Sequence, residues 1–327
     1  MKILVSIHSP FRIWTIPQEY VDRLRRAFPS HAFVHAHDDE EGVRLIPDAE
    51  VAFSSQINPQ HLRAANQLRW IQSPSAGVGG MLYPEMLASA VVITNARGTS
   101  GDIIAEHILA VTLALFRRLP LAFARQAQKT WAQDELGASP GNRPIAGAHF
   151  LIVGMGAIGR ATATRLAALG ASVTGIRRNL GAPAPPGFHA VRRLAELQDA
   201  LRSADVVVIA APQTRETRGL IGAPELACMK QDAVVVNVSR GALLDQDALA
   251  HRLRAGRLGG AALDVFRHEP LDPDDPLWEV PNLLITPHTS GFRPDHWDAV
   301  TELFAENLRR FERREPLLNV VDKQAGY

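Results

Sequence analysis

The stretch Leu151-Ile-Val-Gly154-Met-Gly156-Ala-Ile-Gly159-Arg160 decides how this chain of 327 residues folds. An apolar run leads into the glycine pattern G-x-G-x-x-G and then into a helical pattern. Gly154 permits a tight turn, Gly156 lets the backbone approach a pyrophosphate, and Gly159 lets the helix pack on the strand. The N–H groups and the dipole at the start of that helix favour an anion. The stretch therefore predicts a dinucleotide-binding strand–turn–helix, and a glycine-rich turn without a ligand is the alternative.

The next strand predicts which dinucleotide binds. We expect the turn itself to contact the ligand through Gly154, Met155, Gly156, Ala157, Ile158 and Gly159. An NAD site usually carries Asp or Glu about 20 residues beyond the glycines. Here the strand Ala171–Ile176 runs into Arg177, Arg178 and Asn179, without a carboxylate. Because Arg binds phosphate bidentately, Arg177 and Arg178 favour NADP(H), with NAD(H) possible; two solvated arginines are the alternative.

Composition and charge indicate a soluble globular enzyme. Hydrophobic residues make up 46% of the chain and charged residues 21%, and the length predicts two domains. The formal net charge is +1, with both signs interspersed, so nothing indicates a nucleic-acid or membrane partner. The one cysteine, Cys228, suits a reducing cytoplasm. The N-terminus lacks signal-peptide architecture, and no apolar run approaches the ~18 residues that span a bilayer.

The order of apolar runs predicts two α/β domains. After residue 147, continuous apolar runs are typical of strands buried on both faces of a parallel sheet. They are Ala148–Val153, Ser172–Ile176, Val206–Ala210, Val234–Asn237, Gly260–Asp264 and Leu283–Thr286. Before residue 100 we expect strands at Lys2–Ile7, Glu50–Ser54, Arg69–Gln72 and Val91–Asn95, with a helix at Pro17–Phe28.

The helices and loops outside this alternation carry further expectations. The helix Asp102–Arg118 is apolar on nearly all sides, so it must be buried at a domain junction or a subunit interface. A second helical stretch, Leu119–Ala132, leads into a polar loop at Gln133–Asn142, and Gly181–Gly187 reads as a surface loop. After the last helix, Pro294–Arg314, the apolar tail Leu317–Lys323 is expected to pack back onto the first domain.

Three charged or titratable residues follow predicted strands in the second half: Arg240, Glu269 and His288. The carboxyl ends of the strands line the ligand crevice of an open parallel sheet. Arg can bind a substrate carboxylate, His can transfer a proton to the neighbouring oxygen, and a carboxylate stabilises the protonated imidazole. With a nicotinamide carrying the hydride, this set reduces a 2-keto acid or runs the reverse reaction. Each residue alone has a simpler explanation on the surface, but their joint placement favours catalysis.

The chain resembles the D-isomer-specific 2-hydroxyacid dehydrogenases. The motifs that carry the resemblance are Val238-Ser-Arg240-Gly-Ala-Leu-Leu-Asp245, Asp264-Val-Phe-Arg-His-Glu269-Pro-Leu and Thr286-Pro-His288, with Ser73–Val78, Asn95–Gly98, Ala105-Glu-His107 and Ala210–Thr214. The resemblance covers nearly the whole chain. It implies a doubly wound, Rossmann cofactor domain over residues 99–289. That domain is inserted into a smaller flavodoxin-like substrate domain made of residues 1–98 and 290–327.

The resemblance also implies residue roles. Arg240 binds the substrate carboxylate, and Glu269 and His288 form the proton-transfer pair. Other implied contacts are the N–H groups of Ala76, Gly77 and Val78 with the same carboxylate, Asp264 with the nicotinamide carboxamide, and Pro212, Val238 and Ser239 with the cofactor. Arg177 stands where the family usually has an NAD-selecting Asp. Glu269 argues against the similar formate dehydrogenases, which have Gln there. Family members usually dimerise, which implies a homodimer through the helix Asp102–Arg118.

The leading hypothesis is a cytoplasmic NAD(P)H-dependent reductase of small 2-keto acids such as glyoxylate or hydroxypyruvate, giving D-2-hydroxy acids. One alternative is a phosphoglycerate dehydrogenase, although the chain ends at Tyr327 without the regulatory domain that many of these enzymes carry. A second alternative is a dinucleotide-sensing protein that acts like a corepressor. We expect no metal site. His8, His31, His35, His37 and the run Asp38–Glu41 read as solvated loops, since no metal-ligand spacing links them.

Overall fold

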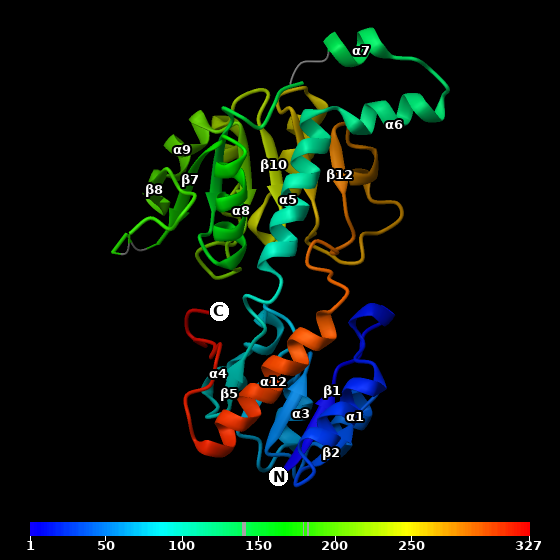
Figure 1. Cartoon of the computed structure of the whole chain (residues 1–327), viewed down its shortest axis with the longest axis vertical. Helices are drawn as coiled ribbons and strands as arrows, with labels where there is room; N and C mark the ends of the chain where they lie inside the picture. Colours follow the sequence, from blue (N-terminus) through cyan, green and yellow to red (C-terminus); the bar gives the residue numbers. More distant parts are fainter. Residues whose placement is uncertain (139–141, 179, 182) are drawn as a thin grey trace. The chain divides into compact units, whose positions relative to one another are not determined.

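The computed structural model describes residues 1–138, 142–178, 180–181 and 183–327. The chain forms two compact units (Figure 1). Unit 1 comprises residues 1–99 and 293–327, and unit 2 comprises residues 100–292. Each unit is built on a parallel sheet with helices on both faces, so the predicted α/β fold class is confirmed.

Unit 2 holds a seven-stranded sheet in the order β12-β11-β10-β9-β6-β7-β8, and every pairing is parallel. Its strands are β6 (His149–Val153), β7 (Ser172–Arg177), β8 (Ala190–Arg193), β9 (Val206–Ile209), β10 (Val234–Asn237), β11 (Gly260–Leu263) and β12 (Leu283–Ile285). The strand order reverses between β6 and β9. In a doubly wound sheet such a reversal opens a crevice at the carboxyl ends of the strands, where ligands bind.

Two sets of helices cover the two faces of this sheet (Figure 1). One face packs against α5 (Gly101–Phe116) and α8 (Ala157–Ala168), and the other packs against α9 (Leu197–Ser203), α10 (Ala223–Cys228) and α11 (Gln246–Arg254). Successive residues of one strand serve opposite faces: Ile152 joins the α5–α8 side and Leu151 the other. Burial on both faces explains why these strands read as continuous apolar runs.

Unit 1 has a five-stranded parallel sheet in the order β2-β1-β3-β4-β5, the flavodoxin-like order. Its strands are β1 (Lys2–Ser6), β2 (Ala32–His35), β3 (Val51–Ser54), β4 (Trp70–Gln72) and β5 (Val92–Thr94). One face packs on α1 (Gln18–Ala27) and α12 (His296–Arg313). Near the other face lie α2 (Asp39–Leu45), α3 (Pro59–Ala64) and α4 (Pro84–Ala88).

The C-terminal tail packs where the sequence predicts. Val320 forms an antiparallel bridge with Thr94, and the N–H of Val321 donates to Ile93 at 2.8 Å. Val321 is 5% exposed in the core of unit 1. The residues after α12 therefore pair with β5.

Several sequence predictions were wrong. The two short strands β2 and β8 were missed. The strand β8 is half-exposed and carries two arginines, so it does not read as an apolar run. The acidic run 38–41 begins α2 with Asp38 as its N-cap and is not a loop. The helix α5 buries one face in unit 2, while Leu113 on another face is 41% exposed. Burial of the rest of this helix at a domain junction or a subunit interface stays a prediction.

The stretch after α5 also differs from the prediction. The helix α6 (Leu119–Ala127) stops five residues before the predicted end, and α7 (Gln133–Ala138) lies where a loop was expected. Residues 139–141 of that predicted loop, Asn179, and residue 182 of the predicted loop 181–187 lie outside the described residues. The other residues of 181–187 contain no helix or strand.

Among the described residues no single helix is long and apolar enough to cross a membrane. The helices α5 and α6 pass the length and composition criteria only when taken together, and they bend by 64° at the break between them.

Candidate active site

The glycine turn after β6 has the geometry that a dinucleotide requires. Gly154 has a φ of +104°, and a Cβ there would lie 2.6 Å from the backbone of Ala210. At Gly159 a Cβ would overlap the carbonyl oxygen of Gly154. The fold itself therefore requires glycine at positions 154 and 159, whether or not a ligand is bound. A Cβ at Gly156, in contrast, would meet no atom within 4 Å, so the space above Gly156 is open to a ligand.

The first turn of α8 can accept the pyrophosphate of a dinucleotide. Gly156 caps the helix without a side-chain hydrogen bond, and no acidic residue lies in the first turn. The leading N–H groups of a helix have no partner inside it, and its dipole favours an anion there. The side chain of Met155, another predicted contact, packs over Gly175 beside Phe188, and contact of Met155 with the ligand stays a prediction.

The two arginines at the end of β7 have different partners. The guanidinium of Arg177 donates to the carbonyl oxygens of Leu180 and Pro183 at 3.4 Å each. Arg178 forms an ion pair with Glu216, with Nη2 and Oε2 2.6 Å apart. Glu216 belongs to the loop after β9, where the Thr217 hydroxyl donates to the carbonyl oxygen of Pro212 at 2.7 Å.

The predicted catalytic residues lie together at the carboxyl edge of the unit 2 sheet. The Nδ1 atom of His288 lies 2.6 Å from Oε2 of Glu269. The other carboxylate oxygen of Glu269 accepts the N–H of Phe266 at 2.8 Å. The Arg240 guanidinium donates to the carbonyl oxygen of Ser239 at 2.6 Å and is close enough to Glu269 for their charges to interact.

The charges of these three residues support one another. Burial alone would raise the pKa of Glu269. Hydrogen bonds from His288 and Phe266, together with the charges of His288 and Arg240, lower it by more than burial raises it, so the pKa lies below its ordinary value. Burial lowers the pKa of Arg240, and Glu269 opposes that shift. An arginine is still protonated at neutral pH. The site therefore holds an ionised carboxylate that interacts with an imidazole and a guanidinium.

Asn237 fixes the turn that carries Arg240, and sequence reasoning missed it. This side chain is fully buried at the end of β10. Its amide nitrogen donates to the carbonyl oxygen of Arg240 at 3.1 Å, and its amide oxygen accepts the N–H of Ser239 at 3.1 Å. Val238 and Ser239, predicted near the cofactor, are 5% and 7% exposed in this turn. The signal that could have indicated this role is an Asn at the end of a predicted buried strand, where a polar side chain needs hydrogen-bond partners.

Asp264 holds the loop that carries His288. Its carboxylate is 1% exposed and accepts hydrogen bonds from the Thr286 hydroxyl at 2.6 Å and from the N–H groups of Thr289 and Ser290 at 2.9 and 3.0 Å. The N–H of His288 donates to the carbonyl oxygen of Asp264 at 2.9 Å, and His288 has a φ of +54°. Asp264 thereby fixes the backbone on both sides of the histidine.

The predicted carboxylate-binding residues Ala76, Gly77 and Val78 belong to unit 1. They follow β4, at the carboxyl end of that sheet. The Asn95 amide donates to the carbonyl oxygen of Ala76 at 2.7 Å, so this loop is held by the residue that follows β5. Ala76 and Gly77 are exposed and Val78 is buried. The substrate-binding role of the three residues stays a prediction.

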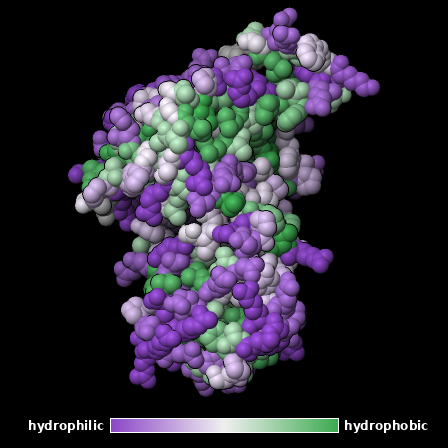
Figure 2. Space-filling view, viewed as in Figure 1, coloured by the Kyte–Doolittle hydropathy of each residue, from purple (hydrophilic) through white to green (hydrophobic). Residues whose placement is uncertain are grey.

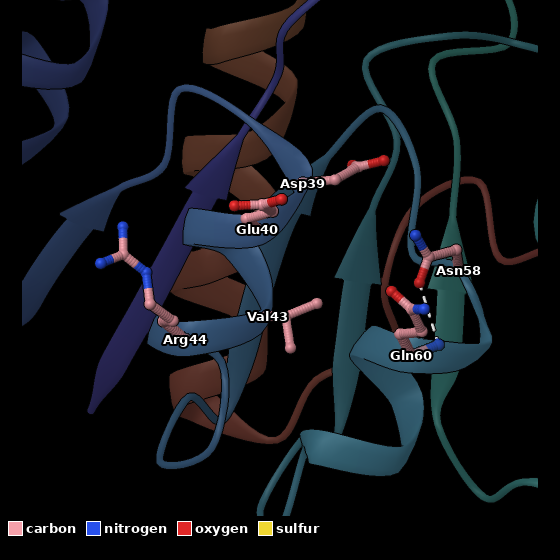
Figure 3. A pocket seen from close by; sticks show the side chains of 6 residues that line it. All are labelled: Asp39, Glu40, Val43, Arg44, Asn58 and Gln60. Carbon is pink, nitrogen blue, oxygen red and sulfur yellow. Dashed lines mark hydrogen bonds between the residues drawn. The ribbon is translucent and has the colours of Figure 1, made fainter.

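None of the predicted site residues lines a surface hollow in unit 1. It is lined by Asp39, Glu40, Val43, Arg44, Asn58 and Gln60, which come from α2 and from α3 with the residue before it (Figure 3). Asn58 caps α3 by accepting the N–H of Gln60 at 2.9 Å. Over the described part of the chain, no group of three His, Cys, Asp or Glu side chains is arranged to hold a metal ion.

Comparison with known proteins identifies the class that this fold and site define. The family of D-isomer specific 2-hydroxyacid dehydrogenases matches through its NAD binding domain over residues 109–290. The chain belongs to this family. The predicted family is therefore confirmed, and with it a Rossmann unit of the kind that binds a nicotinamide dinucleotide.

Three relatives illustrate the similarity. A D-3-phosphoglycerate dehydrogenase from Archaeoglobus fulgidus is 28% identical over 98% of this chain and 59% of its own length. A glyoxylate reductase from Korarchaeum cryptofilum is 31% identical over 82% of this chain and 80% of its own. The crystal structure of an NADPH-dependent glyoxylate/hydroxypyruvate reductase from Sinorhizobium meliloti, in complex with NADP and sulfate, is 27% identical. It covers 100% of this chain and 99% of its own, with a TM-score of 0.85. The chain spans about half the length of the phosphoglycerate dehydrogenases that it matches.

Proposed function

We propose that the protein is an NADP(H)-preferring reductase that converts small 2-keto acids to D-2-hydroxy acids. The observation that carries the proposal is the 2.6 Å hydrogen bond between His288 and Glu269, with Arg240 beside them. Glyoxylate and hydroxypyruvate are the substrates to test first, because two similar proteins are named as reductases of these acids.

Each residue of the site has one role in the proposed reaction. With Nδ1 of His288 directed at Glu269, Nε2 is left to donate a proton to the carbonyl oxygen of the substrate. The Glu269 carboxylate holds the ring in one orientation and stabilises its protonated form. Arg240 binds the substrate carboxylate through two parallel hydrogen bonds and polarises the adjacent carbonyl. A bound reduced nicotinamide supplies the hydride.

The preference for NADP(H) rests on the end of β7. A site for NAD usually has a carboxylate there, and this chain has Arg177 and Arg178. A guanidinium binds a 2′-phosphate through charge and paired N–H groups. A structure similar to this one is described as NADPH-dependent and contains NADP. NAD(H) is proposed as the weaker ligand.

A homodimer through α5 is part of the proposal. Hydrophobic residues gather over the α5 face of unit 2 (Figure 2). The exposed side chains include Leu113, Leu119, Phe123 and Trp131, and the last two are 63% and 90% exposed. Neither α6 nor α7 buries a residue within the described chain, so a partner surface would cover side chains that the fold leaves in water. We also propose a cytoplasmic location, which the single cysteine supports.

A spectrophotometric assay tests the proposed reaction. The purified protein is mixed with NADPH or NADH and with glyoxylate, hydroxypyruvate, pyruvate or 3-phosphohydroxypyruvate, and the loss of the reduced-nicotinamide absorbance is followed. We expect turnover of at least one of these acids, with a higher kcat/KM for NADPH than for NADH. Tight dinucleotide binding without turnover of any acid would instead favour a sensing protein. Size-exclusion chromatography with light scattering tests the dimer.

A further inference from the structure

An ion pair spans the predicted cofactor turn. Arg178 follows β7 and Glu216 follows β9, and these two strands lie on either side of β6 in the sheet. The glycine turn, residues 154–159, follows β6. The 2.6 Å contact between Arg178 and Glu216 therefore joins the loops that flank the turn. A dinucleotide that follows the turn toward the end of β7 meets this pair.

The carboxylate of Glu216 already binds the guanidinium of Arg178. Arg177 donates to two carbonyl oxygens of the loop that follows β7. Arg178, by contrast, reaches across to a charged oxygen. A 2′-phosphate that approaches Arg178 therefore meets a site where Glu216 carries a charge of the same sign as the phosphate.

The ion pair between Arg178 and Glu216 can be broken at little energetic cost. The side chains of Arg178 and Glu216 keep 50% and 59% of their surface exposed. An ion pair this exposed contributes little to stability, because water screens the charges and both side chains lose freedom. A phosphate monoester carries nearly two negative charges at neutral pH and has three acceptor oxygens, so it can displace one carboxylate from the guanidinium.

We propose that Glu216 sets the ratio of the affinities for NADP(H) and NAD(H). Its carboxylate stays on Arg178 when the ligand has no 2′-phosphate, and it must release Arg178 when the ligand has one. The carboxylate missing from the end of β7 is thus supplied by the loop after β9. It weakens the preference for the phosphorylated cofactor without abolishing it. This inference rests on the proposed function for the presence of a dinucleotide at the turn.

Binding of two ligand fragments to the full-length protein tests the inference. Adenosine 2′,5′-bisphosphate and 5′-AMP differ only in the 2′-phosphate, and calorimetry gives a Kd for each with wild type and Glu216→Gln. Removing one negative charge near a phosphate should strengthen binding of the bisphosphate roughly three- to tenfold at low salt. The affinity for 5′-AMP should stay the same or fall, and NADPH and NADH should repeat the pattern. An unchanged ratio of affinities overturns the inference.

Two further variants separate a direct effect from a general change in charge. With Arg178→Gln as the background, Glu216→Gln should change the ratio much less, since the two side chains act through each other. Asp199→Asn removes a similar surface carboxylate, which lies 3.7 Å from Arg202 on α9, and should leave the ratio at the wild-type value. An equal gain in the Arg178→Gln background, or the same gain in Asp199→Asn, overturns the inference.

The binding titrations and the activity assay of the proposed function can give negative results independently of each other. The titrations contain no 2-keto acid, so a protein that binds both fragments and reduces no acid refutes the reaction alone. A wild-type protein that binds neither fragment nor either dinucleotide overturns this inference as well.

Discussion

Gly241 lies so close to Phe266 that a Cβ atom on Gly241 would overlap the Phe266 carbonyl group. Gly241 directly follows Arg240, and the N–H of Phe266 donates to the Glu269 carboxylate at 2.8 Å. The contact brings the turn after β10 against the turn after β11. The distance between the guanidinium and the carboxylate therefore depends on the absence of a side chain at position 241.

Gly241→Ala should lower catalysis much more than cofactor binding. The added methyl group must push the two turns apart, which moves Arg240 away from Glu269 and His288. A misplacement of about 1 Å in an active site can cost roughly 10²-fold in rate. We expect kcat/KM for the 2-keto acid to fall by about that factor, while the Kd for NADPH changes little. Steady-state kinetics and a fluorescence titration of NADPH measure the two quantities.

Gly137→Ala is the matched control for this variant, because a Cβ at Gly137 in α7 meets no atom within 4 Å. It should keep wild-type kinetics. Wild-type kcat/KM in Gly241→Ala would show that the close contact does not position the site.

The sequence predicts the parts of the site that depend on local pattern. The glycine turn is recognisable because each glycine follows from its place between strand and helix, and Arg240, Glu269 and His288 each follow an apolar run. The support of these residues was not predictable in the same way. Asp264 is joined to Thr289 and Ser290 across 25 and 26 residues of chain, and no spacing rule relates such positions. The ion pair of Arg178 with Glu216, 38 residues apart, was missed for the same reason.

Arg240→Lys should raise the KM for the 2-keto acid. An ammonium group is a single point charge and cannot form the two parallel hydrogen bonds that a guanidinium makes with a carboxylate. We expect KM to rise roughly tenfold or more, with an unchanged Kd for NADPH. Arg202→Lys, on the exposed side of α9, is the control. If KM does not change, Arg240 does not bind the substrate carboxylate.

Asp264→Asn should reduce both stability and turnover. The buried carboxylate accepts three hydrogen bonds, and an amide would turn a donor toward at least one of the N–H groups of Thr289 and Ser290. An unsatisfied buried group costs about 1–3 kcal/mol of unfolding free energy. Urea denaturation measures that loss, and kcat should fall because the backbone around His288 is no longer fixed. A variant as stable and active as wild type would contradict the positioning role of Asp264.

Glu269→Gln should change the dependence of activity on pH. The pKa of Glu269 lies below its ordinary value of 4.5, so in the wild type the carboxylate is ionised above that range and its contribution is lost only as the pH falls through the lowered pKa. Gln carries no charge to stabilise protonated His288. We expect kcat for reduction to fall about 10–100-fold at neutral pH, and the difference between the two proteins to shrink as the pH falls through the lowered pKa of Glu269. Identical profiles for the two proteins would remove Glu269 from the proton transfer.

Asp205 joins the amino ends of three strands in unit 2. Its carboxylate accepts the N–H of His149 at 2.7 Å and the Lys230 ammonium at 2.8 Å, and Arg143 lies 3.4 Å away. Burial alone would raise the pKa of Asp205. These hydrogen bonds and positive charges lower it by more than burial raises it, so the pKa of Asp205 lies below its ordinary value of 3.8. The site is far along the sheet from the catalytic turns, since it lies at the opposite ends of the strands.

Asp205→Asn should therefore destabilise the protein at neutral pH without changing its kinetics. A folded-state pKa below the unfolded value contributes stability above the unfolded pKa, and this contribution is lost as the pH falls through the folded pKa. We expect the variant to lose about 1–3 kcal/mol of unfolding free energy at pH 7, and the difference from wild type to shrink as the pH falls below about 4. Urea denaturation at pH 7, 5 and 3.5 measures this convergence. A difference that stays constant over this range would mean that the Asp205 charge does not stabilise the fold.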